Sequence, residues 1–172
     1  MSVSLSRLSC PSCSEPLSAG PGDTVFFCRC GRGCTFTPQG LEIVEAAAYP
    51  APSDRPPQWE PAWELVADVL VAARRNAAGG SAVPPPIRRR LLIPARPMEL
   101  SRLLAQVRAW SSLPAADQQL PGVPILGGDL SSDEAAALAR YAVFAEQVAQ
   151  PDSLIELQVD LSVRSIRLIA VP

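Results

Sequence analysis

The chain has 172 residues, of which 48% are hydrophobic, and its formal net charge is −2 at pH 7. It contains no histidine, and its 15 basic residues are all arginine. A Ser-His-Asp or Cys-His nucleophile, a phosphate-loop lysine and a Schiff-base lysine are therefore excluded, and nothing marks a catalytic pair among the 17 acidic residues. We expect a protein that is not an enzyme.

The cysteines are confined to the first 34 residues, as Cys10, Cys13, Cys28, Cys30 and Cys34. The N-terminus lacks the pattern of a secretory signal, and no apolar run is long enough to span a membrane, so we expect a cytoplasmic protein with reduced thiols. Clustered reduced thiols favour one structural Zn²⁺ bound by four of the five cysteines. Cys28 and Cys34 compete for the fourth place. A redox dithiol and a disulfide are the weaker alternatives.

Residues 8–40 resemble the zinc ribbon, a small metal-bound hairpin domain found in many bacterial proteins. The resemblance rests on the Cys10-Pro-Ser-Cys13 knuckle, the β-prone segment 25–27 and the glycines of the second cysteine cluster. That cluster departs from the usual spacing of two, with one residue between Cys28 and Cys30 and three between Cys30 and Cys34. The resemblance implies a metal site made of four cysteine thiolates, which leave no position for water or substrate. Such a site is structural.

Residues 41–46 predict a strand that leaves the ribbon, and residues 46–61 are rich in proline. We therefore expect a zinc-ribbon domain over 1–45, a linker over 46–61 and an α+β domain over 62–172. Trp59 either packs the linker onto this domain or projects as a docking residue. Pro61 predicts the start of a helix that continues to Arg75, because proline is favoured in the first helical turn.

Further along, the sequence predicts a strand over 88–94, a helix from Pro97 and a short edge strand over 123–126. Ser131 and Glu134 form the pattern of a capping box, which begins the longest helix. The face of this helix that we expect to be buried comprises Leu138, Tyr141, Ala142, Ala145 and Val148. Alternating residues over 155–161 and 166–170 predict a terminal hairpin. The fold class is α+β, with about three helices on a mainly antiparallel sheet.

Charge is distributed unevenly. From Arg74 to Arg108 the chain has eight arginines and one acid, whereas from Ala109 to Val163 it has eight acids and one arginine. The candidate residues for binding an anion or nucleic acid are Arg74, Arg75, Arg88, Arg89, Arg90 and Arg96. The alternative is that the two halves neutralise each other across the fold.

These features favour a zinc-binding adaptor or structural subunit that mediates protein–protein interaction in a larger assembly. The alternative function is a nucleic-acid-binding protein of transcription or repair that uses the Arg74–Arg108 segment. The acidic pI of about 5.2 and the lack of lysine count against this alternative. We expect protein partners, no membrane insertion and no small-molecule substrate.

Overall fold

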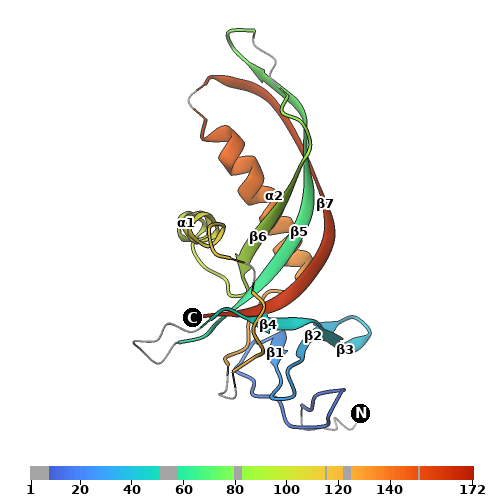
Figure 1. Cartoon of the computed structure of the whole chain (residues 1–172). Helices are drawn as coiled ribbons and strands as arrows, with labels where there is room; N and C mark the ends of the chain where they lie inside the picture. The colour runs from blue at the N-terminus through green and yellow to red at the C-terminus, as the bar shows by residue number, and fades with distance from the viewer. Residues whose placement is uncertain (1–7, 51–57, 80–82, 115, 122–124, 151) are drawn as a thin grey trace.

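The structure is a computed structural model that describes residues 8–50, 58–79, 83–114, 116–121, 125–150 and 152–172. In these residues, two sheets and two helices are present (Figure 1). A three-stranded antiparallel sheet contains β1 (Val25–Phe27), β2 (Gly33–Thr37) and β3 (Gly40–Val44). The larger sheet has the order β4-β7-β5-β6, with β4 (Ala46–Ala48), β5 (Glu60–Asn76), β6 (Ile87–Pro94) and β7 (Leu154–Val171). The helices are α1 (Leu100–Trp110) and α2 (Ser132–Val148).

The predicted helix over 61–75 is wrong, because these residues belong to the strand β5. Alternate side chains such as Trp63, Leu65 and Ala67 are buried in the main core, and the intervening Glu64 and Asp68 face the opposite side of the sheet. Burial therefore alternates with a period of two, the pattern of a strand, in a segment whose apolar residues also fit one face of a helix. Pairing with β6 on one edge and β7 on the other gives β5 more stabilisation than its helical propensity provides.

The predicted terminal hairpin is also wrong, since β7 is one continuous strand of 18 residues. The proposed turn, residues 162–165, contains neither glycine nor proline, and β5 offers an antiparallel partner of similar length. A bulge between Val66 and Ala67 of β5 leaves Arg164 of β7 without an opposite residue. The two strands curve together along the whole larger sheet (Figure 1). The described residues consequently contain two helices and not the expected three.

Several of the other predicted helices and strands are confirmed. The strands expected at 25–27 and 88–94 are β1 and β6, and the helix expected after Pro97 is α1. Ser131 caps α2, and its hydroxyl accepts from the N–H of Glu134 while the Glu134 carboxylate accepts from the N–H of Ser131. The buried face of α2 differs from the expected one, because Tyr141 and Val148 are exposed. The edge strand expected over 123–126 lies partly outside the described residues.

The main core fills the space between one face of the larger sheet and the two helices. Val25 and Phe27 of β1 belong to this core, and so does Trp59, which packs inward rather than projecting. A second apolar cluster is centred on Leu92 of β6 and Ile169 of β7. None of the helices in the described part of the chain is long and apolar enough to cross a lipid bilayer.

Backbone hydrogen bonds join the N-terminal sheet to the segment before α2, and the residue before β4 to β7. The N–H groups of Thr24 and Val25 donate to the carbonyl of Gly128, at 2.7 and 3.0 Å, and the N–H of Leu168 donates to Glu45. A Cβ on Gly128 would lie 2.5 Å from the carbonyl oxygen of Ala95, so this close approach requires glycine. Of the segment expected as a linker, Ala46–Ala48 pairs in parallel with β7, and residues 51–57 lie outside the described part.

Candidate metal centre

The first pair of thiols lies on a tight loop before β1. An isolated bridge joins Ser9 to Pro16, and within it the N–H of Cys10 donates to the carbonyl of Glu15 at 2.8 Å. The N–H of Ser14 donates back to the carbonyl of Cys10 at 2.9 Å, and Ser14 has a positive φ of 62°. The loop therefore reverses within a few residues and brings the side chains of Cys10 and Cys13 together.

The second pair lies on the turn that joins β1 to β2. The N–H of Cys28 donates to the carbonyl of Arg32 at 2.8 Å, and the N–H of Gly31 donates to the carbonyl of Cys28 at 3.0 Å. Gly31 has a φ of +88°, a conformation that residues with a Cβ rarely adopt. The glycine lets the chain turn sharply enough for Cys28 and Cys30 to face the first loop.

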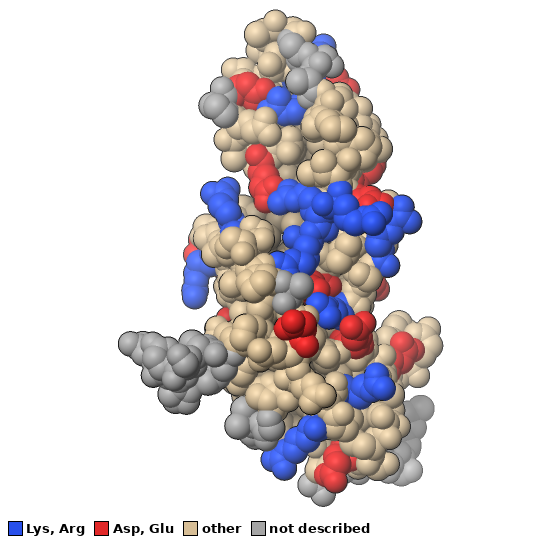
Figure 2. Space-filling view, viewed as in Figure 1, with Lys and Arg blue, Asp and Glu red and all other residues tan. Residues whose placement is uncertain are grey.

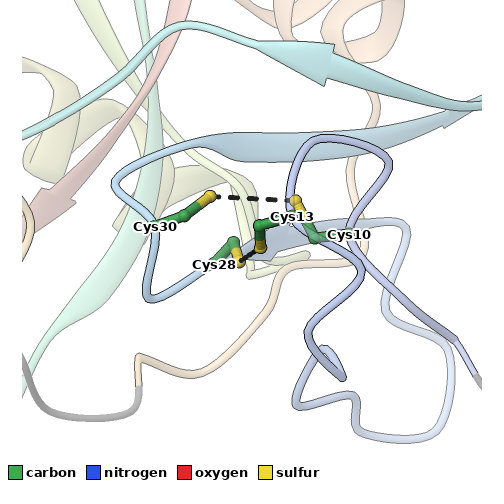
Figure 3. A group of neighbouring side chains, drawn as sticks. All are labelled: Cys10, Cys13, Cys28 and Cys30. Atoms are coloured by element: carbon green, nitrogen blue, oxygen red, sulfur yellow. Dashed lines mark hydrogen bonds between the residues drawn. The ribbon is translucent and has the colours of Figure 1, made fainter.

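The four sulfur atoms of Cys10, Cys13, Cys28 and Cys30 lie within 4.8 Å of one another (Figure 3). The Sγ atoms of Cys10 and Cys30 are 3.8 Å apart, and those of Cys13 and Cys28 are 3.4 Å apart. A tetrahedral ion with Zn–S bonds of about 2.3 Å places its sulfur ligands about 3.8 Å apart. These two distances are close to that value and all four sulfurs lie within 4.8 Å, so the four thiols could hold a single metal ion.

Cys34 is near this group but is not one of the four mutually close thiols. Its sulfur lies 3.9 Å from that of Cys10. It sits on β2, opposite Phe26 of β1 and Ile43 of β3, and it is fully buried in the small core beneath the loops. Of the two residues that compete for the fourth place, the geometry therefore groups Cys28 with the other three, and Cys34 serves as a small apolar core residue.

The environment changes the acidity of these thiols. Burial raises the pKa of Cys10, but hydrogen bonds from the backbone N–H groups of Ser12 and Cys13, together with those from the thiols of Cys28 and Cys13, outweigh burial and lower the pKa to about 7. Burial raises the pKa of Cys28, and it raises that of Cys34 to about 12. N–H groups directed at a sulfur stabilise the thiolate, the form that binds metal.

The candidate anion-binding arginines are engaged with other groups of the protein. Each of five makes an ion pair: Arg74 with Asp152, Arg75 with Glu156, Arg88 with Asp68, Arg89 with Glu146 and Arg90 with Glu64. The guanidinium of Arg96 donates to the carbonyl of Gly127. Figure 2 shows a band of basic side chains across the middle of one face with acidic side chains beside it. Arg74, Arg75 and Arg89 pair with acids of the 109–163 segment, as the neutralisation hypothesis expects, whereas Arg88 and Arg90 pair with Asp68 and Glu64, which precede both segments.

Two of these ion pairs extend into triads that the sequence analysis did not identify. Glu64 accepts from Arg90 of β6 and from Arg167 of β7, and its side chain is 5% exposed. Asp68, on the same face of β5, accepts from Arg88 and Arg164 in the same manner. The sequence could have revealed this arrangement only if 61–75 had been assigned as a strand. The two acids then lie on one face of β5, beside the arginines of the two neighbouring strands.

A polar cleft of about 500 Å³ lies beside the second cysteine turn. Arg29 and Arg32 line it from the turn, and Arg167 and Asp117 line it from the larger domain. Both signs of charge therefore meet where the N-terminal sheet adjoins the rest of the molecule.

Comparison with protein-family models, with curated protein sequences and with solved structures finds no match to this chain.

Proposed function

We propose that the chain binds one structural Zn²⁺ through Cys10, Cys13, Cys28 and Cys30, and that its N-terminal part is a zinc ribbon. The observation that carries the metal proposal is that the four sulfurs lie within 4.8 Å of one another, with two of their distances, 3.8 and 3.4 Å, close to the edge of a tetrahedral unit of one zinc and four sulfurs. Thiolate donors favour zinc over hard cations such as Mg²⁺ and Ca²⁺. The ribbon proposal is supported by the two cysteine loops that lie at one end of a three-stranded antiparallel sheet.

We further propose that the protein acts without catalysis, as an adaptor or structural subunit of a larger assembly in the cytoplasm. Four thiolates would fill the coordination shell of the metal, so the ion has no open position for a substrate or an activated water. The metal would instead fix the loops at 8–16 and 28–34, because the free energy of metal binding stabilises the folded state. A rigid N-terminal sheet fused to a larger α+β unit suits the presentation of docking surfaces to other proteins.

The nucleic-acid alternative has less support. A nucleic-acid interface needs guanidinium groups that are free to neutralise phosphates. Five of the six candidate arginines are instead held by carboxylates of the protein, and both flanking arginines of Asp68 share that single acid. Protein partners are therefore the first hypothesis to test.

Affinity purification of the tagged full-length chain from its own host tests this function, with half of the lysate treated with nuclease. Stoichiometric partner proteins that survive nuclease are expected with the wild-type chain and are expected to be lost with Cys10→Ser/Cys13→Ser, which removes two metal ligands. The matched control is Cys34→Ala, which leaves the four grouped thiols intact. Partners that vanish on nuclease treatment would contradict the adaptor function and support nucleic acid as the ligand.

A further inference from the structure

The thiols of the candidate metal centre differ in their access to solvent. Cys13 and Cys30 are exposed, whereas Cys10 and Cys28 are buried, with exposed fractions of 1% and 4%. Each of the two cysteine loops therefore carries one exposed thiol and one buried thiol. Cys30 also lines the polar cleft of about 500 Å³ beside the second cysteine turn, so a small solute can reach this residue from solvent.

Each exposed thiol lies close to a buried thiol of the other loop. The sulfur of Cys13 is 3.4 Å from that of Cys28, and the sulfur of Cys30 is 3.8 Å from that of Cys10. Figure 3 shows both contacts as dashed lines that cross from one loop to the other. Because the sulfurs of a disulfide are about 2.05 Å apart, each pair needs an approach of less than about 2 Å to form that bond.

An exposed thiolate beside a buried one is the arrangement that a peroxide oxidises to a disulfide. A thiol that coordinates a metal is deprotonated, and the thiolate is the nucleophilic form of cysteine. Cysteines that sense oxidants are accessible to solvent and lie next to a second thiol, which resolves the first oxidation product. Cys13 and Cys30 meet the first condition, and their buried neighbours Cys28 and Cys10 meet the second.

We propose that the metal centre is a peroxide-sensitive switch, which is oxidised at Cys13 and Cys30 and resolved by Cys28 and Cys10. This inference rests on the proposed zinc site and names its regulation. The products are the disulfides Cys13–Cys28 and Cys10–Cys30, and Zn²⁺ is released. Cys34 stays a free thiol, because it is fully buried in the small core beneath the loops even though its sulfur lies 3.9 Å from that of Cys10.

Each disulfide consumes one molecule of hydrogen peroxide. The exposed thiolate attacks one peroxide oxygen, so an S–O bond forms, the O–O bond breaks, and hydroxide leaves and takes up a proton to become water. The sulfur gives two electrons to the peroxide and becomes a sulfenic acid. The buried thiolate then attacks that sulfur, so the S–S bond forms, the S–O bond breaks, and a second hydroxide leaves and is protonated to water. Two peroxide molecules thus convert the four thiolates into two disulfides, and the metal loses its ligands.

The two disulfides retain the connection that the metal makes. Both join the loop at 8–16 to the loop at 28–34, so neither loop is released when zinc leaves. A cross-link between residues that are distant in sequence restricts the unfolded chain and thereby stabilises the folded state. Oxidation should therefore leave the N-terminal sheet folded without zinc, whereas removal of the metal from the reduced chain should loosen it.

The test treats the zinc-loaded full-length chain with hydrogen peroxide and measures zinc release with a chromogenic chelator. Two peroxide molecules should be consumed for each zinc released, and dithiothreitol followed by Zn²⁺ should restore the loaded form, because disulfides are reversible. Hydrogen exchange in β1 should be at least about tenfold slower in the oxidised chain than in the reduced chain after chelation.

The disulfides are mapped by mass spectrometry after free thiols are alkylated. Trypsin cleaves after Arg29 and Arg32, which places Cys28, Cys30 and Cys34 on three separate peptides. We expect one disulfide inside the peptide that ends at Arg29, a second that joins this peptide to that of Cys30, and an alkylated Cys34. The matched variant is Cys34→Ala, which should release zinc at the wild-type rate and form the same two disulfides.

Any of three results would overturn the proposal. Zinc stays bound while peroxide is in excess, or the disulfides form within one loop or include Cys34, or sulfinic and sulfonic acids replace the disulfides. Mapping of the wild-type chain decides between these results without any variant. An untreated chain that holds no zinc would instead refute the proposed metal site. One zinc before treatment together with any of the three results would leave the metal site intact and refute only the switch.

Discussion

Replacing Glu64 with Gln removes the buried carboxylate that Arg90 and Arg167 share on the face of the larger sheet opposite the helices. The side chain of Glu64 is 5% exposed, whereas those of Arg90 and Arg167 are each 23% exposed. Gln keeps the size of the residue and its capacity to accept a hydrogen bond, but it leaves both guanidinium groups without their buried counter-charge. The variant therefore isolates the effect of the charge from that of packing.

Breaking a buried ion pair by removing one partner typically costs about 3–5 kcal/mol. Both arginines keep other partners, since Arg90 donates to the hydroxyl of Tyr49, and Arg167 donates to the carbonyl of Ala116 and pairs with the exposed Glu45 at 3.5 Å. The loss should accordingly lie at the lower end, at about 3 kcal/mol. For a chain of this size, each 1 kcal/mol lowers Tm by about 2–4 °C, so Glu64→Gln should lower Tm by roughly 6–12 °C.

The assay is thermal and urea unfolding of the zinc-loaded chain, and Asp68→Asn is the matched control. Asp68 accepts from Arg88 and Arg164 in the same geometry, but these arginines are 68% and 62% exposed. Water solvates them after the change, so Asp68→Asn should lower Tm by much less than Glu64→Gln. Equal losses in the two variants, or a larger loss for Asp68→Asn, would refute the argument that burial decides the cost.

Three further predictions concern the N-terminal attachment, the metal and acid stability. Gly128→Ala should destabilise the chain by about 1–3 kcal/mol in urea unfolding, because its Cβ would clash with the carbonyl of Ala95. Gly22→Ala is the control: its Cβ would meet no other atom within 4 Å, so it should show only the strain of a φ of +89°. Removal of bound metal with a chelator should expose Val25 and Phe27, which join the N-terminal sheet to the main core. Hydrogen exchange should then be faster in β1 than in the distant part of β5. The hydrogen bond from Arg74 holds the pKa of Asp152 below its usual range, so its stabilisation is present above the unfolded pKa and is lost as pH falls through the folded value. Asp152→Asn should thus reduce the Tm difference between neutral pH and a pH of about 3 relative to wild type, and an unchanged difference would contradict the assignment.

Local patterns predicted the elements whose stabilisation is local. The Ser131–Glu134 capping box begins α2 as expected, and four of the five candidate cysteines lie together, although their spacing left the fourth place open between Cys28 and Cys34. Such signals are encoded within a few residues, so no knowledge of the rest of the fold is needed.

Non-local pairing accounts for the expectations that fail. Residues 61–75 fit a helix and a strand equally well, and only the neighbouring β6 and β7 decide for the strand. The same pairing joins 154–171 into one strand across the expected turn. The helix α2 has apolar residues on two opposite sides, so its sequence alone does not indicate which side is buried. In the structure the small Ala135 and Ala139 are buried and Tyr141 is exposed.

The most direct test of the metal centre compares Cys28→Ala with Cys34→Ala, measuring zinc per chain by elemental analysis and the metal's ligands by X-ray absorption. The wild-type chain should contain one zinc with four sulfur ligands at about 2.3 Å. Cys34→Ala should keep that zinc and its four sulfurs, and Cys28→Ala should lose the stoichiometric metal. Retention of a full equivalent of zinc by Cys28→Ala together with its loss from Cys34→Ala would contradict the grouping of Cys10, Cys13, Cys28 and Cys30.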